Sequence, residues 1–183
     1  MSTRSQILFK FPDGQVLVYR HSDGYPYTIH GVVADLVEFF KWNLGRNSQY
    51  DYLIANYFYW MKKHSEDYID YDWKLGKKKR NSVPIHKRKL GGNESVLIGH
   101  GLDYHGRLHG DIEWFYLVEF FEDLNFNMEQ NIIIKVFEVY AFNIEYEYPE
   151  QLIRNEMPKM TFTIEDIENY KLQIPEFPKD DDE

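Results

Sequence analysis

The segment Asp111–Phe121 limits the folds open to this chain more than any other stretch of its sequence. Every second position in it, from Ile112 to Phe120, carries a bulky apolar side chain. A period of two places such side chains on one face of a β-strand. The β-branched and aromatic run Ile132–Phe142 predicts another long strand. The residues between them, 123–130, allow the two strands to pair antiparallel.

Two shorter apolar runs near the N-terminus predict a β-hairpin. Gln6–Phe11 and Gln15–Arg20 are joined through Pro12-Asp13-Gly14. An Asp-Gly pair between two apolar runs is a strong hairpin signal, because glycine accepts the positive φ that the turn requires.

Two amphipathic helices are predicted after the hairpin. Apolar residues from Val32 to Leu44 recur at spacings of three and four, which aligns them in one stripe along a helix. A second helix begins at the capping pattern Ser48–Asp51 and runs to His64. Because only residues 45–47 separate the two, we expect them to be antiparallel neighbours.

The order of these elements, completed by a short strand at Ser95–Ile98, predicts an α+β fold. We expect a mainly antiparallel sheet of about five strands with a two-helix hairpin packed on one face, plus a C-terminal extension. Residues 1–149 would form a single domain with a basic loop at about 74–93. Residues 150–183 would form an appendage that ends in a disordered acidic tail.

The composition excludes several classes of protein. The 183-residue chain has no cysteine, which excludes thiol catalysis, thiolate zinc sites and disulfide scaffolds. No apolar run approaches the roughly 20 residues that span a bilayer, and the first residues lack the apolar core of a signal peptide. We therefore expect a cytoplasmic protein without membrane association. The chain has no GxxxxGK[ST], GxGxxG or GxSxG motif, and we expect no cofactor.

The charge is unevenly distributed. Residues 74–90 contain eight basic side chains and no acidic one, which leaves the rest of the chain with a net charge of −17. Such a chain repels polyanions, so duplex nucleic acid is an unlikely partner. The basic run is typical of a solvated loop, although it would also hold a small anion or an acidic patch of a partner.

The first candidate for a binding site is the segment Tyr19–Pro26. Arg20 presents a forked donor for a phosphate or carboxylate, and His21, Asp23 and Tyr25 follow within five residues. The same residues also suit a simple turn, in which Asp23 caps the turn and the glycine after it relieves backbone strain. Both interpretations remain open.

The second candidate is the histidine- and glycine-rich stretch Gly99–Asp111. His105 and His109 would contact a ligand or act as acid and base, or they would be surface residues of a flexible loop. Their spacing matches no zinc signature. Asp111 and Glu113 lie two residues apart on the predicted strand, where they would anchor a divalent cation or face solvent.

Both candidates resemble motifs of an uncharacterised family of small proteins from prokaryotes and their viruses. Tyr19–Pro26 is similar to its Y-R-H-x-D-G-Y-P motif, and His109–Glu113 is similar to its H-G-D-I-E motif. The resemblance covers roughly residues 6–142. It implies no defined activity, but small proteins of this setting include binders of host defence factors and of nucleotide signals.

Three functions follow as hypotheses. The first is a non-enzymatic binding protein for a small anionic, nucleotide-type ligand, such as one that sequesters a defence signal. Its predicted ligand-binding residues are Arg20, His21, Asp23, Tyr25, His105 and His109. The second is a phosphodiesterase or nuclease that uses the histidines and Asp/Glu. The third is an acidic interaction module or inhibitor that binds a protein partner through its acidic surface.

The aromatic content predicts a homodimer. Tyrosine, phenylalanine and tryptophan make up 17% of the chain, more than one core of this size needs. Four aromatic residues of the second helix fall outside its apolar stripe: Tyr50, Tyr52, Phe58 and Tyr59. A helix that is apolar on several sides is usually covered on several sides, either by a second subunit or by residues 150–178 of the same chain.

Overall fold

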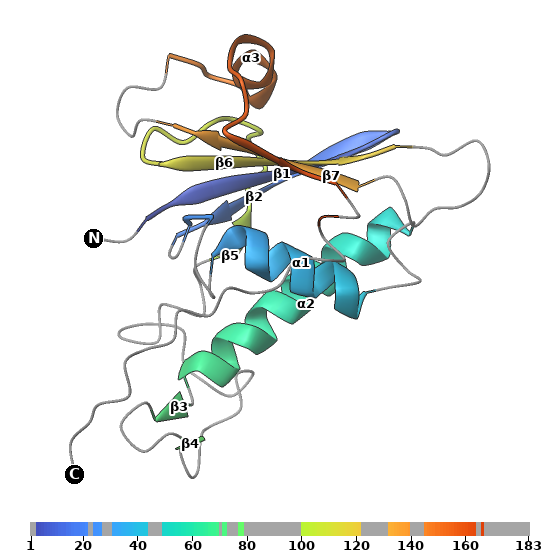
Figure 1. Cartoon of the computed structure of the whole chain (residues 1–183), viewed down its shortest axis with the longest axis vertical. Helices are drawn as coiled ribbons and strands as arrows, with labels where there is room; N and C mark the ends of the chain where they lie inside the picture. Colours follow the sequence, from blue (N-terminus) through green and yellow to red (C-terminus); the bar gives the residue numbers. More distant parts are fainter. Residues whose placement is uncertain are drawn as a thin grey trace.

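The computed structural model describes residues 3–21, 24–26, 31–43, 49–69, 71–72, 77–78, 100–121, 132–139, 145–163 and 166 (Figure 1). For residues 62–69, 71–72, 77–78 and 100, the description is limited to the backbone. The segment Ser95–Ile98, most of the predicted basic loop and the acidic tail therefore lie outside the described residues.

Six strands form the main sheet, in the order β5-β2-β1-β6-β7-β8. Their bounds are β1 Ser5–Phe11, β2 Gly14–Arg20, β5 His100–Leu102, β6 Trp114–Phe120, β7 Ile132–Glu138 and β8 Met160–Phe162. All neighbours pair antiparallel except β1 and β6, which are parallel. The predicted α+β class and mainly antiparallel sheet are confirmed, with six strands in place of about five.

The predicted hairpin is present as β1 and β2, which pair from Phe11↔Gly14 to Ser5↔Arg20. The sheet is built around the parallel pair of β1 and β6, in register from Ser5↔Trp114 to Lys10↔Glu119. The strand β6 is therefore central. This position explains why its side chains are buried on both faces of the sheet: Tyr116 and Val118 on one, Phe115 and Leu117 on the other.

Two helices cover one face of the sheet, α1 Val32–Trp42 and α2 Tyr50–Ile69 (Figure 1). They share one apolar core with the sheet, and Phe39 of α1 contacts the rings of Tyr57 and Trp60 of α2. The connection of residues 44–48, which would make them a helical hairpin, lies outside the described residues. The helix α2 continues to Ile69, past its predicted end at His64. It is followed by the two-residue strands β3 Tyr71–Asp72 and β4 Lys77–Lys78, which pair antiparallel.

The opposite face carries a second, smaller apolar cluster, which the sequence did not lead us to expect. Leu8, Phe115 and Phe137 of the sheet pack there with Leu152 of the short helix α3, Pro149–Asn155. Figure 1 shows α3 on the side of the sheet away from α1 and α2. After α3 the chain adds β8 next to β7, so the segment from residue 150 to residue 162 is part of this sheet fold. No helix within the described ranges is both long and apolar enough to cross a membrane.

Candidate functional site

The alternation of β2 sends two neighbouring residues of the first motif to opposite faces. Arg20 points to the helical face, where it is 4% exposed and its guanidinium donates to the carboxylate of Asp35 on α1. The Tyr57 side chain lies close by, and burial raises the pKa of its phenol above the usual range, with Arg20 opposing and Asp35 adding to the shift. Arg20 was predicted to bind a ligand, but the structure places it in a core ion pair.

The other residues of the first motif are also dispersed. The backbone carbonyl of Tyr25 accepts a hydrogen bond from Val32 at the start of α1, 3.0 Å away. The side chain of His21 is exposed, with its ring centre 6.3 Å from that of Tyr19. Asp23 lies outside the described residues. His21 is related to the histidine-rich second motif through Tyr19, whose ring stacks on that of His109.

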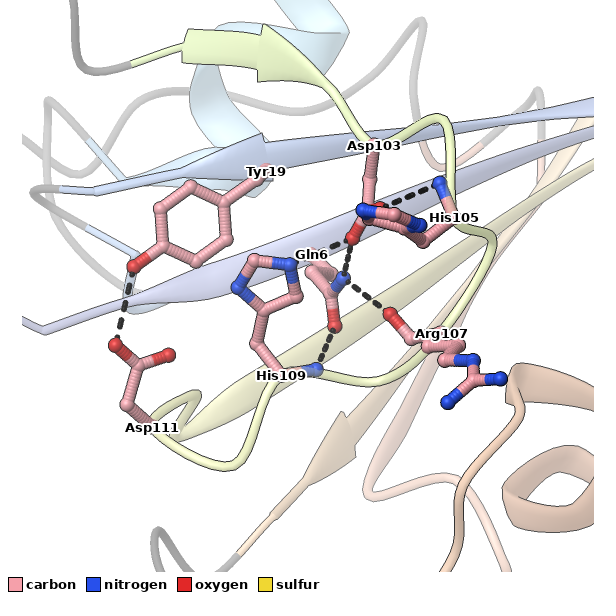
Figure 2. Close-up of polar contacts among 7 residues, drawn as sticks. All are labelled: Gln6, Tyr19, Asp103, His105, Arg107, His109 and Asp111. Carbon is pink, nitrogen blue, oxygen red and sulfur yellow. Dashed lines mark hydrogen bonds and ion pairs between the residues drawn. The ribbon is translucent and has the colours of Figure 1, made fainter.

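A buried glutamine organises the second motif (Figure 2). Gln6 of β1 is 0% exposed, and its side-chain amide N–H groups donate to the Asp103 carboxylate at 2.7 Å and to the Arg107 carbonyl at 2.9 Å. Its amide oxygen accepts from the backbone N–H of His109 at 3.0 Å. Three hydrogen bonds from one rigid strand residue therefore hold the loop 103–109 over the sheet.

Asp103 and His109 form the central pair of this site. The Asp103 carboxylate is 3% exposed and lies 2.8 Å from Nε2 of His109, whose side chain is 43% exposed. A second acceptor position of the same carboxylate is occupied by the backbone N–H of His105, at 3.2 Å. The imidazole of His109 is thus fixed at one nitrogen, while Nδ1 lies on the side of Tyr19 and Asp111 in Figure 2.

The ring of Tyr19 forms a wall beside this imidazole. It stacks on His109 with a centroid distance of 4.6 Å, and its hydroxyl donates to Asp111 at 3.4 Å. Burial raises the pKa of Tyr19, the Asp111 carboxylate adds to the shift, and Arg4 opposes it. The phenol therefore stays protonated and serves as a donor at neutral pH.

Asp111 also forms an ion pair with Arg4, at 3.0 Å. One carboxylate oxygen of Asp111, Oδ1, and the Nε of Arg4 are buried without a hydrogen-bond partner. Glu113, the other residue of the predicted cation site, contacts Arg4 through its backbone N–H. Within the described part of the chain, no cluster of three metal-ligating side chains is present.

His105 lies on the outer side of the loop. Its ring is tilted against that of Tyr104, with a centroid distance of 3.9 Å, and both side chains are exposed. Nearby, Arg107 pairs with Glu147 at 2.8 Å and lies over the ring of Tyr148. His105 and His109 therefore share the backbone of one loop, but the carboxylate of Asp103 binds the side chain of His109 alone.

An open groove of about 330 Å³ lies next to the loop. It is lined by Leu8, Gln15, Val16, Leu17, Leu102, Asp103, Tyr104, His105, Gly106 and Pro149. Most of this lining is apolar. The groove therefore lies on the Tyr104 and His105 side of Asp103, whereas Nδ1 of His109 lies on the other side.

Three residues build the site but were not among the predicted ligand-binding residues: Gln6, Tyr19 and Asp103. Of these, Tyr19 and Asp103 lie within the two candidate segments, and Gln6 lies outside them. The sequence contained a signal for Gln6, because a polar residue within an apolar strand needs a hydrogen-bond partner when it is buried. Its side chain lies on the same face of the sheet as that of Leu8, the face covered by α3. The sequence contained a signal for Tyr19 as well. It precedes Arg20 by one residue, so the side chains of the two residues point to opposite faces of the strand. The pairing of Asp103 with His109 needs the fold of the loop and has no local signal.

The chain was compared with protein-family models, with curated proteins and with solved structures, and none of the three comparisons found a match.

Proposed function

We propose that the protein binds a small anionic ligand of the nucleotide type at the exposed side of His109. The observation that carries the proposal is the pair of His109 and Asp103, in which a buried carboxylate fixes Nε2 of a half-exposed imidazole. Fixing one nitrogen directs the other, Nδ1, to a defined position beside Tyr19. In the doubly protonated imidazole, the Nδ1–H group is a preoriented donor, which binds a phosphate or carboxylate oxygen without first losing side-chain freedom.

The formal charges of Asp103, Asp111 and Arg4 beside His109 sum to −1, and a doubly protonated imidazole brings this sum to zero. Only the doubly protonated imidazole donates from both nitrogens, so this is the form of His109 that would bind the anion.

Thermal unfolding with inorganic phosphate and with a panel of nucleoside mono-, di- and triphosphates tests the proposal. A ligand at 100 times its dissociation constant raises the free energy of unfolding by about 2.7 kcal/mol. We expect His109→Gln to weaken binding at least about tenfold, because a charge-assisted hydrogen bond contributes about 1.5–3 kcal/mol.

The matched control is His105→Gln. This histidine lies in the same loop, but the Asp103 carboxylate accepts only from its backbone N–H, so its replacement should leave affinity within about twofold. Equal losses in both variants would point to general electrostatics. A panel without any stabilising member would refute the proposal.

A second candidate function is hydrolysis of a phosphodiester ligand at the same place. It is favoured by the same pair, because a carboxylate that orients an imidazole is the arrangement that activates a water or hydroxyl as general base. The two functions differ in turnover. Ligand that is recovered intact after denaturation of the complex supports binding, and chemically altered ligand supports hydrolysis.

The homodimer remains a prediction. Of the four aromatic residues of α2 on which it rests, two are partly buried against the core and two are exposed. Tyr50 and Phe58 pack against the core of the same chain, whereas Tyr52 and Tyr59 are 59% and 63% exposed. The ring of Tyr59 stacks on that of Trp42, which is also exposed. We propose these three rings as the contact between subunits, a surface separate from His109 and its loop.

A further inference from the structure

The outer edge of β2 is only partly paired. β5 pairs with it over three residues, from Arg20↔His100 to Val18↔Leu102, and one further hydrogen bond runs from the Asp103 N–H to the Leu17 carbonyl at 2.8 Å. The chain then turns away, with a 3.3 Å hydrogen bond from the Gly106 N–H to the Asp103 carbonyl. Gly106 adopts a φ of 65°, which glycine permits.

The turn leaves the first half of β2 with an open edge. Among the described strands, none pairs with the outer side of Gly14–Val16. Because the Leu17 carbonyl points to the outer side, the period of two along the strand directs the backbone N–H and C=O of Gln15 to the same side. Such groups form a template for one more strand.

The 330 Å³ groove lies along this open edge. Its walls are Leu8 and Leu17 of the hairpin, Pro149 of α3 and the turn that follows Asp103. Two large apolar side chains at its rim, Leu102 and Tyr104, are 60% and 86% exposed. The groove is near the lower end of the size range of ligand pockets, about 300–1,000 Å³, so it suits the side chains of a short segment.

Carboxylates flank the same edge. Gln15 donates to Glu150 of α3 at 2.7 Å, and Asp13 lies in the hairpin turn two residues before Gln15. The chain as a whole has a net charge of −9. An occupant with basic side chains is therefore favoured over an acidic one.

We propose that an extended peptide of a partner protein, in which basic residues alternate with apolar ones, adds to the open edge of β2 at Gly14–Val16. Its backbone would bond to Gln15, and its apolar side chains would fill the groove on the α3 face of the sheet, beside Glu150. Its basic side chains would alternate to the opposite face of the added strand, near Asp13 in the hairpin turn. Strand addition of this kind obtains affinity from the backbone and specificity from alternate side chains. This site lies across Asp103 from Nδ1 of His109 and does not depend on the ligand proposed there.

The test is titration of the full chain with a fluorescein-labelled peptide of three Lys-Val repeats, followed by fluorescence anisotropy. We expect saturable binding, and slower amide hydrogen exchange at Gln15 in the complex. Gln15→Pro should weaken binding at least about tenfold, because proline lacks the N–H, while an edge position tolerates it. Gln15→Thr keeps the N–H and is the matched control.

Two changes in the peptide keep the test independent of the folding of any variant. The peptide nitrogens belong to two sets of alternate residues, and methylation of the set that faces β2 should abolish binding. Replacement of the lysines by glutamate should weaken the binding of the peptide. His109→Gln should leave peptide affinity unchanged, which separates this site from the proposed anion site. The proposal fails if the Lys-Val peptide does not bind saturably, or if methylation weakens binding at neither of the two sets of alternate nitrogens.

Discussion

Arg20 and Asp35 are almost completely removed from water, with side-chain exposures of 4% and 6%. Two buried charges remain acceptable only while each compensates the other. We expect Arg20→Met alone to lower the free energy of unfolding by about 3–5 kcal/mol, because it leaves the Asp35 carboxylate buried without its guanidinium. Urea unfolding measures this loss.

The double variant Arg20→Met/Asp35→Leu separates a structural ion pair from a ligand-binding arginine. It should recover much of the stability lost in the single variant, since no unpaired charge then remains in the core. It should also leave the anion affinity at His109 unchanged. Additive losses in the double variant would contradict this account of Arg20.

At the scale of residues, we predicted the first motif as one group and did not assign its residues to the two faces of the strand. The residues of the motif that contains Arg20 and His21 are close together in the sequence, which suggests a single cluster of side chains. The period of two along β2 then separates Arg20, which faces the helices, from Tyr19, which faces the loop. That separation was predictable from the strand alone, whereas the contact of His109 with Asp103 follows from the tertiary path of the loop.

At the scale of elements, three strands are joined by one carboxylate. Glu119 of β6 accepts from Lys10 of β1 at 3.1 Å and from Lys135 of β7 at 2.6 Å. Burial raises the pKa of Glu119, but the hydrogen bonds and charges of the two lysines outweigh it and hold the pKa below its usual value. The carboxylate thus links the parallel and the antiparallel neighbour of the central strand.

The lowered pKa of Glu119 means that its ionised form stabilises the folded state. A carboxyl group whose pKa is lower in the folded state stabilises the fold above its unfolded pKa, and this contribution is lost as the pH falls through the folded value. We expect Glu119→Gln to lower the free energy of unfolding by about 1–2 kcal/mol at pH 7. The difference from the native chain should close in acid, below the usual glutamate pKa of about 4.3.

Denaturant unfolding over a pH series measures this gap. Glu145→Gln provides the control, because Glu145 is exposed and its replacement should change stability by less than about 0.5 kcal/mol. A gap between native chain and Glu119→Gln that stays constant down to pH 3 would show that lost packing, and not lost charge, causes the effect.

The elements that the sequence predicted well are those with long apolar patterns. Both long helices and the strand β6 follow from apolar periodicity. The hairpin follows from two apolar runs around Asp-Gly, and β7 follows from its β-branched and aromatic residues. The strands β5 and β8 span three residues each, too few for a periodic signal. The parallel pairing of β1 with β6 joins residues more than 100 positions apart. It depends on the burial of both faces of β6 in the complete fold, and no local sequence pattern predicts that burial.

At the scale of the whole molecule, the sheet is a middle layer covered on both sides. α1 and α2 cover one side, and α3 together with the loop 103–111 covers the other. The second cover is thin, since α3 has seven residues and Leu152 is its one apolar side chain that is fully within the cluster. The candidate sites at His109 and at the β2 edge both lie on this thinly covered side.

Removal of the chain after residue 148 tests how far the C-terminal segment completes the fold. The truncated chain loses α3 and β8, so the apolar surface around Phe115 and Phe137 and the edge of β7 become exposed to water. We expect aggregation on sedimentation, because an uncovered apolar face and a long unpaired strand edge both favour association.

The full-length variant Leu152→Ala is the graded comparison, and it should lose about 2–5 kcal/mol of stability while keeping the β7–β8 edge paired. If the truncated chain instead sediments as a stable species with native unfolding behaviour, α3 and β8 add nothing to the core. If Leu152→Ala is destabilised yet sediments like the native chain, covering the strand edge by β8 is what prevents association, and the second cluster contributes stability alone.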